Sequence, residues 1–308
     1  MKDHERHSER SSYWREGTFL PHEVFAGLEP RYSSLQQARA VILPVPYDST
    51  SEWRAGSRHG PQAIIDASQY LELYDLELDR EIHEVGISTL PRVEPLLSSP
   101  QDMIDRVYQV IRGLVEQEKF VVLLGGEHTL SVGAVRAFKE AFPRLSVLQL
   151  DAHADLRDEY LGTKYSQACV MRRIFEFCPI CQVGIRSLSW EEKQFLTQHK
   201  LTPFYISDLA SNRASIDDIV NSLSEDVYIT IDVDVFDPSI MPAVGTPEPD
   251  GMSWRQVVDI VESVTRRKRV VGFDLVEFCP GEGPRSCAFL LAKLAYKLIG
   301  YTVRQEGR

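Results

Sequence analysis

Seven short apolar runs recur along the 308-residue chain, and they restrict its possible folds more than any other feature. They are rich in β-branched residues and nearly continuous in apolar character, which is typical of strands buried on both faces of a parallel sheet. The runs span residues 40–48, 120–126, 145–153, 180–186, 202–207, 226–237 and 269–278. Apolar residues at helical spacing mark residues 100–118, 130–142, 253–267 and 287–301 as helices. This alternation predicts an α/β fold with a parallel sheet and right-handed crossovers.

No linker, internal repeat or low-complexity tract interrupts the pattern, so we expect a single domain over residues 1–308. The N-terminal segment is polar and lacks the apolar region of a secretory signal. We expect residues 1–20 to form a polar N-terminal arm. Ser99-Pro100 and Ser253 are expected helix starts, because serine caps helices and proline favours their first turn.

Composition excludes some partners. The chain carries 45 acidic and 34 basic residues, a net charge of −11, and no dense basic block. This argues against nucleic acid and anionic membranes as partners, and it mildly favours a cationic substrate. No apolar stretch reaches the roughly 20 residues that a membrane-spanning helix needs. The five cysteines are odd in number and scattered, which is typical of reduced thiols, and we expect a cytoplasmic protein.

The unusual polar residues follow the predicted strands, at the edge where ligands bind in open α/β sheets. "GGEH" (125–128), "DAHAD" (151–155) and "DVD" (232–234) each end an apolar run. In an extended backbone, residues i, i+2 and i+4 point to one face. We therefore expect the acidic and imidazole side chains of "DAHAD" to point the same way, and likewise the two aspartates of "DVD".

Any one of these clusters could be a turn or a helix cap, but their joint occurrence indicates a metal site. Four carboxylates that converge without cations would repel one another and lose several kcal/mol each in desolvation. Two divalent cations remove this conflict. Carboxylates and imidazoles without thiolates suit Mn²⁺, Fe²⁺ or Co²⁺, and two metals that share a hydroxide favour hydrolysis. The predicted ligands are His128, Asp151, His153, Asp155, Asp232 and Asp234.

The motifs together resemble the ureohydrolases, the arginase and agmatinase family. The resemblance rests on "GGEH", "DAHADLRDEY", "YITIDVDVFDP", "GTPEPDGMSW" and "GFDLVEFCP", and it covers about residues 38–302. It implies a three-layer αβα sandwich, two Mn²⁺ per subunit, and hydrolysis of a small guanidino compound to urea and an amine. It also implies a homo-oligomer, either a trimer or a hexamer.

The resemblance also implies a role for each site residue. One manganese would be bound by His128, Asp151, Asp155 and Asp232. The other would be bound by His153 and Asp234, with Asp151 and Asp232 bridging the pair. Asp155 would also orient the bridging hydroxide, and Glu277 would hold the guanidinium group of the substrate. A carboxylate suits this second task because a guanidinium is a planar cationic fork.

The substrate tail separates branches of the family. Ser187 lies where arginases carry an aspartate, and "GTPEPDGMSW" is the agmatinase-like form of its loop, which favours a decarboxylated substrate such as agmatine. "DEYLGTKYSQACVMRRI" resembles the branch that includes N1-aminopropylagmatine ureohydrolases. Asp158 or Glu159 would bind the amine at the far end of the tail. If Arg157 faces the pocket, a guanidino acid becomes the better substrate.

One residue departs from the family pattern. Gln167 stands where the family often has a histidine that passes a proton to the leaving amine. Glutamine can form hydrogen bonds but cannot transfer a proton, and losing a general acid typically lowers the rate ~10²–10⁴-fold. Gln167 therefore leaves open a catalytically impaired metal-binding homologue. Arg157 leaves open a guanidino-acid hydrolase such as guanidinobutyrase, and the metal ligands alone would also suit an unrelated di-metal hydrolase such as a phosphoesterase.

Overall fold

One eight-stranded sheet organises the protein in the computed structural model, which describes residues 24–303. The expected N-terminal arm, residues 1–20, lies outside the described residues. The strand order is β4-β1-β5-β10-β9-β6-β7-β8, and every pair of neighbours is parallel. The strands are β1 (Ala40–Val45), β4 (Ile87–Thr89), β5 (Phe120–Gly125), β6 (Leu145–Leu150), β7 (Ile180–Ile185), β8 (Phe204–Tyr205), β9 (Asp226–Asp232) and β10 (Arg269–Val276).

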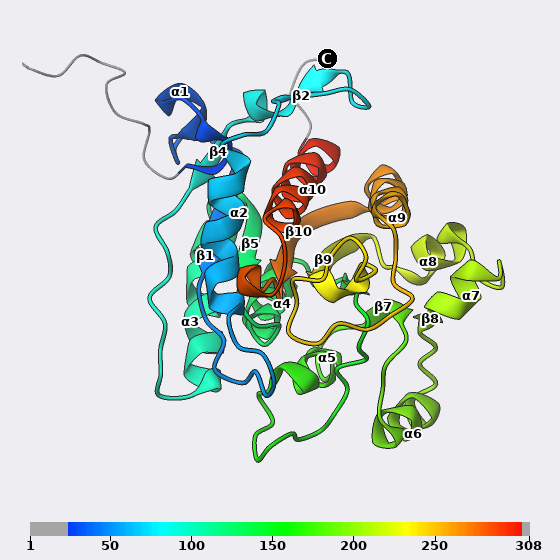
Figure 1. Cartoon of the computed structure of the whole chain (residues 1–308). Helices are drawn as coiled ribbons and strands as arrows, with labels where there is room; N and C mark the ends of the chain where they lie inside the picture. Colours follow the sequence, from blue (N-terminus) through cyan, green and yellow to red (C-terminus); the bar gives the residue numbers. More distant parts are fainter. Residues whose placement is uncertain (1–23, 304–308) are drawn as a thin grey trace, which may run out of the picture.

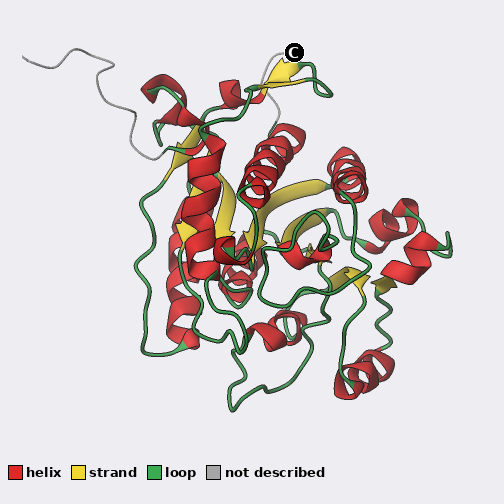
Figure 2. Cartoon of the chain, in the orientation of Figure 1, coloured by secondary structure: helices red, strands yellow, loops and turns green. Residues whose placement is uncertain are grey.

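Helices cover both faces of the sheet (Figure 1). One layer contains α2 (Gly60–Ser68), α7 (Ile206–Ala210), α8 (Ile216–Ser222), α9 (Trp254–Arg267) and α10 (Ser286–Thr302). The other contains α3 (Pro100–Val115), α4 (Leu130–Ala141), α5 (Val170–Phe175) and α6 (Trp190–His199). Figure 2 shows helices, coloured red, around the yellow strands. The three-layer αβα sandwich predicted from the sequence is confirmed.

The central strands contribute to two separate cores, because successive side chains point to opposite faces. In β1, Ala40 and Ile42 pack with the α2 and α10 layer, whereas Val41 and Leu43 pack with the α3 and α4 layer. All four side chains are buried. The nearly continuous apolar runs of the sequence therefore reflect strands that have no face exposed to solvent.

Both expected helix starts are confirmed by their caps. The Ser99 side chain accepts a hydrogen bond from the Asp102 amide before α3, and Ser253 forms a reciprocal capping box with Gln256 before α9. The short helices α1 (Pro30–Ser33), α5, α7 and α8 and strand β4 were not predicted, because elements this short carry little periodicity. Helix α6 was not predicted either, because Phe195 and Leu196 are its only buried apolar residues. In the described part of the chain, no helix is long and apolar enough to cross a membrane.

Candidate active site

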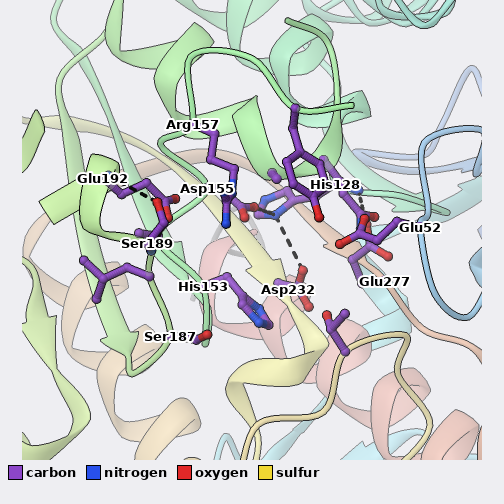
Figure 3. Close-up of a pocket in the computed structure, with 16 residues that line it drawn as sticks. Glu52, His128, His153, Asp155, Arg157, Ser187, Ser189, Glu192, Asp232 and Glu277 are labelled. Carbon is purple, nitrogen blue, oxygen red and sulfur yellow. Dashed lines mark hydrogen bonds and ion pairs between the residues drawn. The ribbon is translucent and has the colours of Figure 1, made fainter. Parts of the chain in front are cut away.

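The predicted site residues lie at the carboxyl ends of four adjacent strands, β5, β10, β9 and β6. His128 comes three residues after β5, and Glu277 directly follows β10. The three ionisable residues of "DAHAD" follow β6, Asp232 is the last residue of β9, and Asp234 lies in the 3₁₀ turn η5 (Val233–Val235). Figure 3 shows His128, His153, Asp155 and Asp232 pointing toward a common centre. The parallel topology thus brings together residues that are up to 149 positions apart.

One group of possible metal ligands surrounds the imidazole of His128. Its Nδ1 atom lies 3.1 Å from Asp155 Oδ2, 3.3 Å from Asp151 Oδ2 and 3.6 Å from Asp232 Oδ2. This nitrogen is buried and has no hydrogen-bond partner among the described residues. A buried lone pair that faces three carboxylates fits a metal ion, which would satisfy all four groups at once.

A second group lies beside the first and shares Asp151 with it. His153 Nδ1 lies 2.8 Å from Asp234 Oδ2 and 3.8 Å from Asp151 Oδ1. Ligand atoms of His128, Asp151 and Asp232 lie close enough to hold one ion, as do those of Asp151, His153 and Asp234. All six predicted ligands therefore converge, and one carboxylate lies between the two groups.

The backbone that achieves this is not the extended one expected from the sequence. Strand β6 ends at Leu150, and Asp155 has a positive φ of 53°. The Asp151 carboxylate accepts a hydrogen bond from the amide of His153, two residues on, and the Asp232 carboxylate accepts one from the amide of Asp234. Such aspartate turns end a strand. The side chains still converge because these turns aim them inward, and the expectation of one strand face was wrong.

The carboxylates of the site are costly to ionise without a cation. Burial raises the pKa of Asp232 well above its usual value, and repulsion by Asp234 and Asp151 raises it further. The same two effects, burial and repulsion by neighbouring aspartates, raise the pKa of Asp151 to about 7. Burial alone would lower the pKa of His153, but the nearby Asp234 and Asp151 raise it to about 10. This site therefore favours positive charge at its centre.

Glu277 lies beside the two groups of possible metal ligands and belongs to neither of them. Its Oε1 accepts a 2.6 Å hydrogen bond from the His128 amide, and its own amide donates to Gly126 O over 2.7 Å. Its φ is positive, at 65°. Burial, followed by repulsion from Glu127, raises the pKa of Glu277 well above its usual value. The carboxylate is held by the His128 amide and has no ion-pair partner among residues 24–303, a role that a guanidinium group would fill.

A cavity of about 220 Å³ opens over this centre, and His128, His153, Asp155, Asp232 and Glu277 form part of its wall. These side chains leave room for a small ligand directly beside the two possible metal positions. The arrangement offers two groups of side chains that could hold cations, a separate half-buried carboxylate and a cavity in contact with both.

A protein-family model identifies the relationship. The model of the arginase family matches residues 38–300. The chain belongs to the arginase family. The resemblance stated from the sequence motifs is thereby confirmed, and so is the prediction of a hydrolase that acts on C–N bonds of linear amidines.

Curated relatives and solved structures agree with the arginase-family assignment. The chain is 38% identical to the N(1)-aminopropylagmatine ureohydrolase of Synechocystis sp., over 87% of this chain and 90% of the relative. It is 36% identical to the agmatinase of Pyrococcus horikoshii, over 88% and 94% of the two chains. The crystal structure of agmatine ureohydrolase of Thermoplasma volcanium superposes with a TM-score of 0.80 at 33% identity, covering 87% and 91%.

Two of the four residues predicted to bind the substrate tail line the cavity of this arginase-family protein. They are Arg157 and Gln167. Asp158 and Glu159 are not among the described residues that line it. Asp158 instead forms an ion pair of 2.6 Å with Arg173, whose guanidinium is buried and needs a carboxylate partner. The structure thus directs the Asp158 carboxylate to helix α5 and away from the cavity.

Two carboxylates that the sequence analysis missed do line the cavity, Glu52 and Glu192. Glu192 is buried and accepts hydrogen bonds from the amides of Leu156 and Ser189, so it supports the loop after "DAHAD". The Ser-x-x-Glu spacing of a capping box could have located it. Glu52 accepts a hydrogen bond from the Gln167 side chain, a contact with no local sequence signal.

A third missed carboxylate, Glu127, lies within the quoted "GGEH" motif. Its Oε2 accepts a 2.6 Å hydrogen bond from the amide of Thr50, and its Oε1 is buried without a partner among the described residues. Burial raises the pKa of Glu127 to about 7. Glu127 therefore ties the loop that carries Glu52 to the turn that carries His128.

Proposed function

We propose that this protein hydrolyses the guanidino group of agmatine or N1-aminopropylagmatine, releasing urea together with putrescine or spermidine. Such a reaction would belong to polyamine biosynthesis. The convergence of six histidine and aspartate side chains next to the half-buried Glu277 carboxylate carries the proposal. The names of relatives at 36–38% identity over most of the chain support it.

Two Mn²⁺ ions per subunit are part of the proposal. His128, Asp151, Asp155 and Asp232 would hold one ion, and Asp151, His153, Asp232 and Asp234 would hold the other. When bound, the ions supply a hydroxide nucleophile at neutral pH. The donor set supports this choice, because carboxylates mixed with imidazoles and no thiolate suit manganese.

Glu277 would bind the guanidinium group and Asp155 would orient the nucleophile. Glu277 is preorganised by its two backbone contacts, so a bound guanidinium needs no rearrangement of the carboxylate. Pairing with this cation favours the ionised form of Glu277, which burial otherwise disfavours. Hydrolysis would form a bond from a hydroxide oxygen to the guanidino carbon and break the bond from that carbon to the tail nitrogen. The proton of the hydroxide would pass to that nitrogen, so that urea and the free amine are released.

The substrate tail would pass the residues around Gln167. Asp158 is paired with Arg173, which makes Glu52 the better candidate for attracting an ammonium group. Gln167 donates to Glu52 and cannot itself transfer a proton. Gln167 therefore acts in our proposal by positioning the leaving group. If Gln167 cannot position the leaving group, the protein would be a catalytically impaired metal-binding homologue.

A guanidino-acid hydrolase is the second candidate, and Arg157 favours it. Arg157 lines the cavity, and its guanidinium lies 4.8 Å from the centre of the Tyr160 ring. No carboxylate lies within ion-pair distance of Arg157 in the part of the chain that the structure describes. A substrate carboxylate, as in 4-guanidinobutyrate, would fill that role.

Urea release from the purified protein tests both candidates. The substrates are agmatine, N1-aminopropylagmatine, arginine and 4-guanidinobutyrate, each with and without added Mn²⁺. Mn²⁺-dependent turnover of an amine-tailed substrate supports the proposal, and preference for 4-guanidinobutyrate supports the second candidate. Arg157→Gln discriminates further, because it should raise KM for the acid and leave an amine-tailed substrate unimpaired. No urea from any substrate, with metal bound, would contradict both.

The proposals for the partners, the cellular location and the oligomeric state rest on the sequence. The net charge of −11 supports a small cationic substrate rather than nucleic acid or a membrane as partner. A cytoplasmic location and a homo-oligomer, trimer or hexamer, remain parts of the proposal. Multi-angle light scattering of the purified protein measures the oligomeric state directly.

A further inference from the structure

Three hydroxyl groups converge on one buried carboxylate below the site, that of Asp274 in β10. Ser131 Oγ of α4 lies 2.7 Å from Asp274 Oδ2, and Tyr228 OH of β9 lies 2.8 Å from the same oxygen. Thr230 Oγ1, also of β9, lies 2.6 Å from Oδ1. Asp274 is fully buried. Burial raises the pKa of Asp274, but the three hydroxyls at hydrogen-bond distance stabilise its ionised form. An ionised carboxylate only accepts hydrogen bonds, so each hydroxyl directs its proton toward Asp274.

Thr230 extends this arrangement to the site. Its Oγ1 lies 2.8 Å from Nε2 of His128, and both side chains are fully buried. A hydroxyl has one proton, and the Thr230 hydroxyl donates its proton in a hydrogen bond to Asp274. The Thr230 oxygen can therefore only accept from His128, so Nε2 must carry a hydrogen.

The consequence falls on the other ring nitrogen of His128. With hydrogen on Nε2, the neutral ring has its lone pair on Nδ1, the atom that faces Asp151, Asp155 and Asp232. We propose that Asp274 is a positioning residue, which acts through Thr230 to fix the metal-binding tautomer and orientation of His128. This inference rests on the proposed function, because it requires a metal ion at the His128 group. Outer-sphere partners of this kind typically change metal affinity 10–100-fold.

A purely structural role for Asp274 makes a different prediction. The contacts from Ser131 and Tyr228 tie α4 and β9 to β10, so Asp274 could serve only the packing of these elements. Loss of such a role would lower the thermal stability of the metal-free protein and leave metal affinity unchanged. If Asp274 instead acts on His128 through Thr230, loss of the Thr230 hydroxyl alone should lower the metal affinity.

Thr230→Val and Thr230→Ser form the decisive pair. Valine, like threonine, is β-branched and favours strands but lacks the hydroxyl, whereas serine retains it. The measurements are Mn²⁺ titration by calorimetry, the Mn²⁺ electron paramagnetic resonance spectrum, and thermal unfolding of each metal-free protein. We expect Thr230→Val to weaken Mn²⁺ binding 10–100-fold and to change the spectrum. Thr230→Ser should remain within about threefold of the wild type.

Asp274→Asn provides an independent test at unchanged size. The asparagine amide can donate to Thr230, whose proton then turns to His128 Nε2 and favours the wrong tautomer, so Mn²⁺ affinity should fall as in Thr230→Val. Wild-type affinity in both Thr230→Val and Asp274→Asn would overturn the inference, whatever happens to unfolding. A wild-type protein that binds Mn²⁺ but releases no urea would overturn the proposed function alone. A wild-type protein that binds no Mn²⁺ would overturn both.

Discussion

The side-chain amide of Gln167 donates a 3.0 Å hydrogen bond to Glu52 Oε2, from a position 115 residues away in the sequence. The Gln167 backbone amide donates to Thr50 Oγ1, and the Thr50 amide donates to Glu127. The loop around Glu52 is therefore attached to both the His128 turn and the 3₁₀ turn that begins at Gln167. Because a carboxylate cannot donate, this contact also fixes which end of the Gln167 amide faces Glu52.

Glu52→Gln should lower kcat/KM for agmatine about tenfold. The change keeps the size of the side chain but removes a charge-assisted hydrogen bond, typically about 1.5–3 kcal/mol, and frees the Gln167 amide to rotate. Steady-state urea release measures the effect. Glu72→Gln, an exposed glutamate that does not line the cavity, is the control. Equal loss in both variants would show that net charge, rather than the Gln167 contact, matters.

Asp234→Ala should remove bound metal and turnover together. Asp234 Oδ2 contacts the His153 ring, and its Oδ1 accepts a hydrogen bond from the Ala152 amide, so the truncation opens one of the two ligand groups. We expect at least one Mn²⁺ fewer per subunit and a fall in kcat of about 100-fold or more. Elemental analysis and urea release check these outcomes, with Asp237→Ala as control. Full metal content in Asp234→Ala would refute the proposed ligand set.

Glu77 should stabilise the fold in a pH-dependent way. Its carboxylate lies 2.6 Å from both Lys297 Nζ and Arg255 Nη1. The hydrogen bond from Lys297, the strongest favourable contact, holds the pKa of Glu77 at about 2, against 4.5 in the unfolded chain. Because the folded pKa is the lower one, the stabilisation is complete above pH 4.5 and disappears as the pH falls toward 2.

Glu77→Gln tests this pH dependence by urea unfolding between pH 7 and pH 3. The Glu77 side chain is half exposed, so we expect a difference of about 1 kcal/mol or less at pH 7. The difference should shrink as the pH falls below 4.5. A difference that does not depend on pH would exclude the ion pair as its cause.

Alanine at two helical glycines should have effects of opposite sign. A Cβ at Gly133 in α4 would lie 2.3 Å from the backbone oxygen of Ile104 in α3, so Gly133→Ala should destabilise the fold by about 1–3 kcal/mol. A Cβ at Gly113 in α3 meets no atom within 4 Å, and Gly113→Ala should stabilise by about 0.5–1 kcal/mol. Thermal unfolding measures both. Equal effects would mean that α3 and α4 do not pack as described.

The residues that converge at the site were predictable because each lies at or near the end of a recognisable strand. In a parallel sheet the carboxyl ends of all strands meet at one edge, so polar residues that follow several strands must be neighbours. This reasoning located His128, Asp151 and Asp232 without coordinates. It did not give the local backbone, since the positive φ of Asp155 arises in a loop that has no period.

The sequence by itself determined the parallel α/β sheet, the family and the six residues that converge at the site. It did so because periodicity and motif spacing are local properties of the chain. Only the tertiary structure decided which carboxylates line the cavity. Glu52 reaches the cavity through a contact with Gln167, and Asp158 leaves it for Arg173. Such pairings form between side chains that are distant in the sequence and meet only in the folded protein, so no local sequence pattern indicates them.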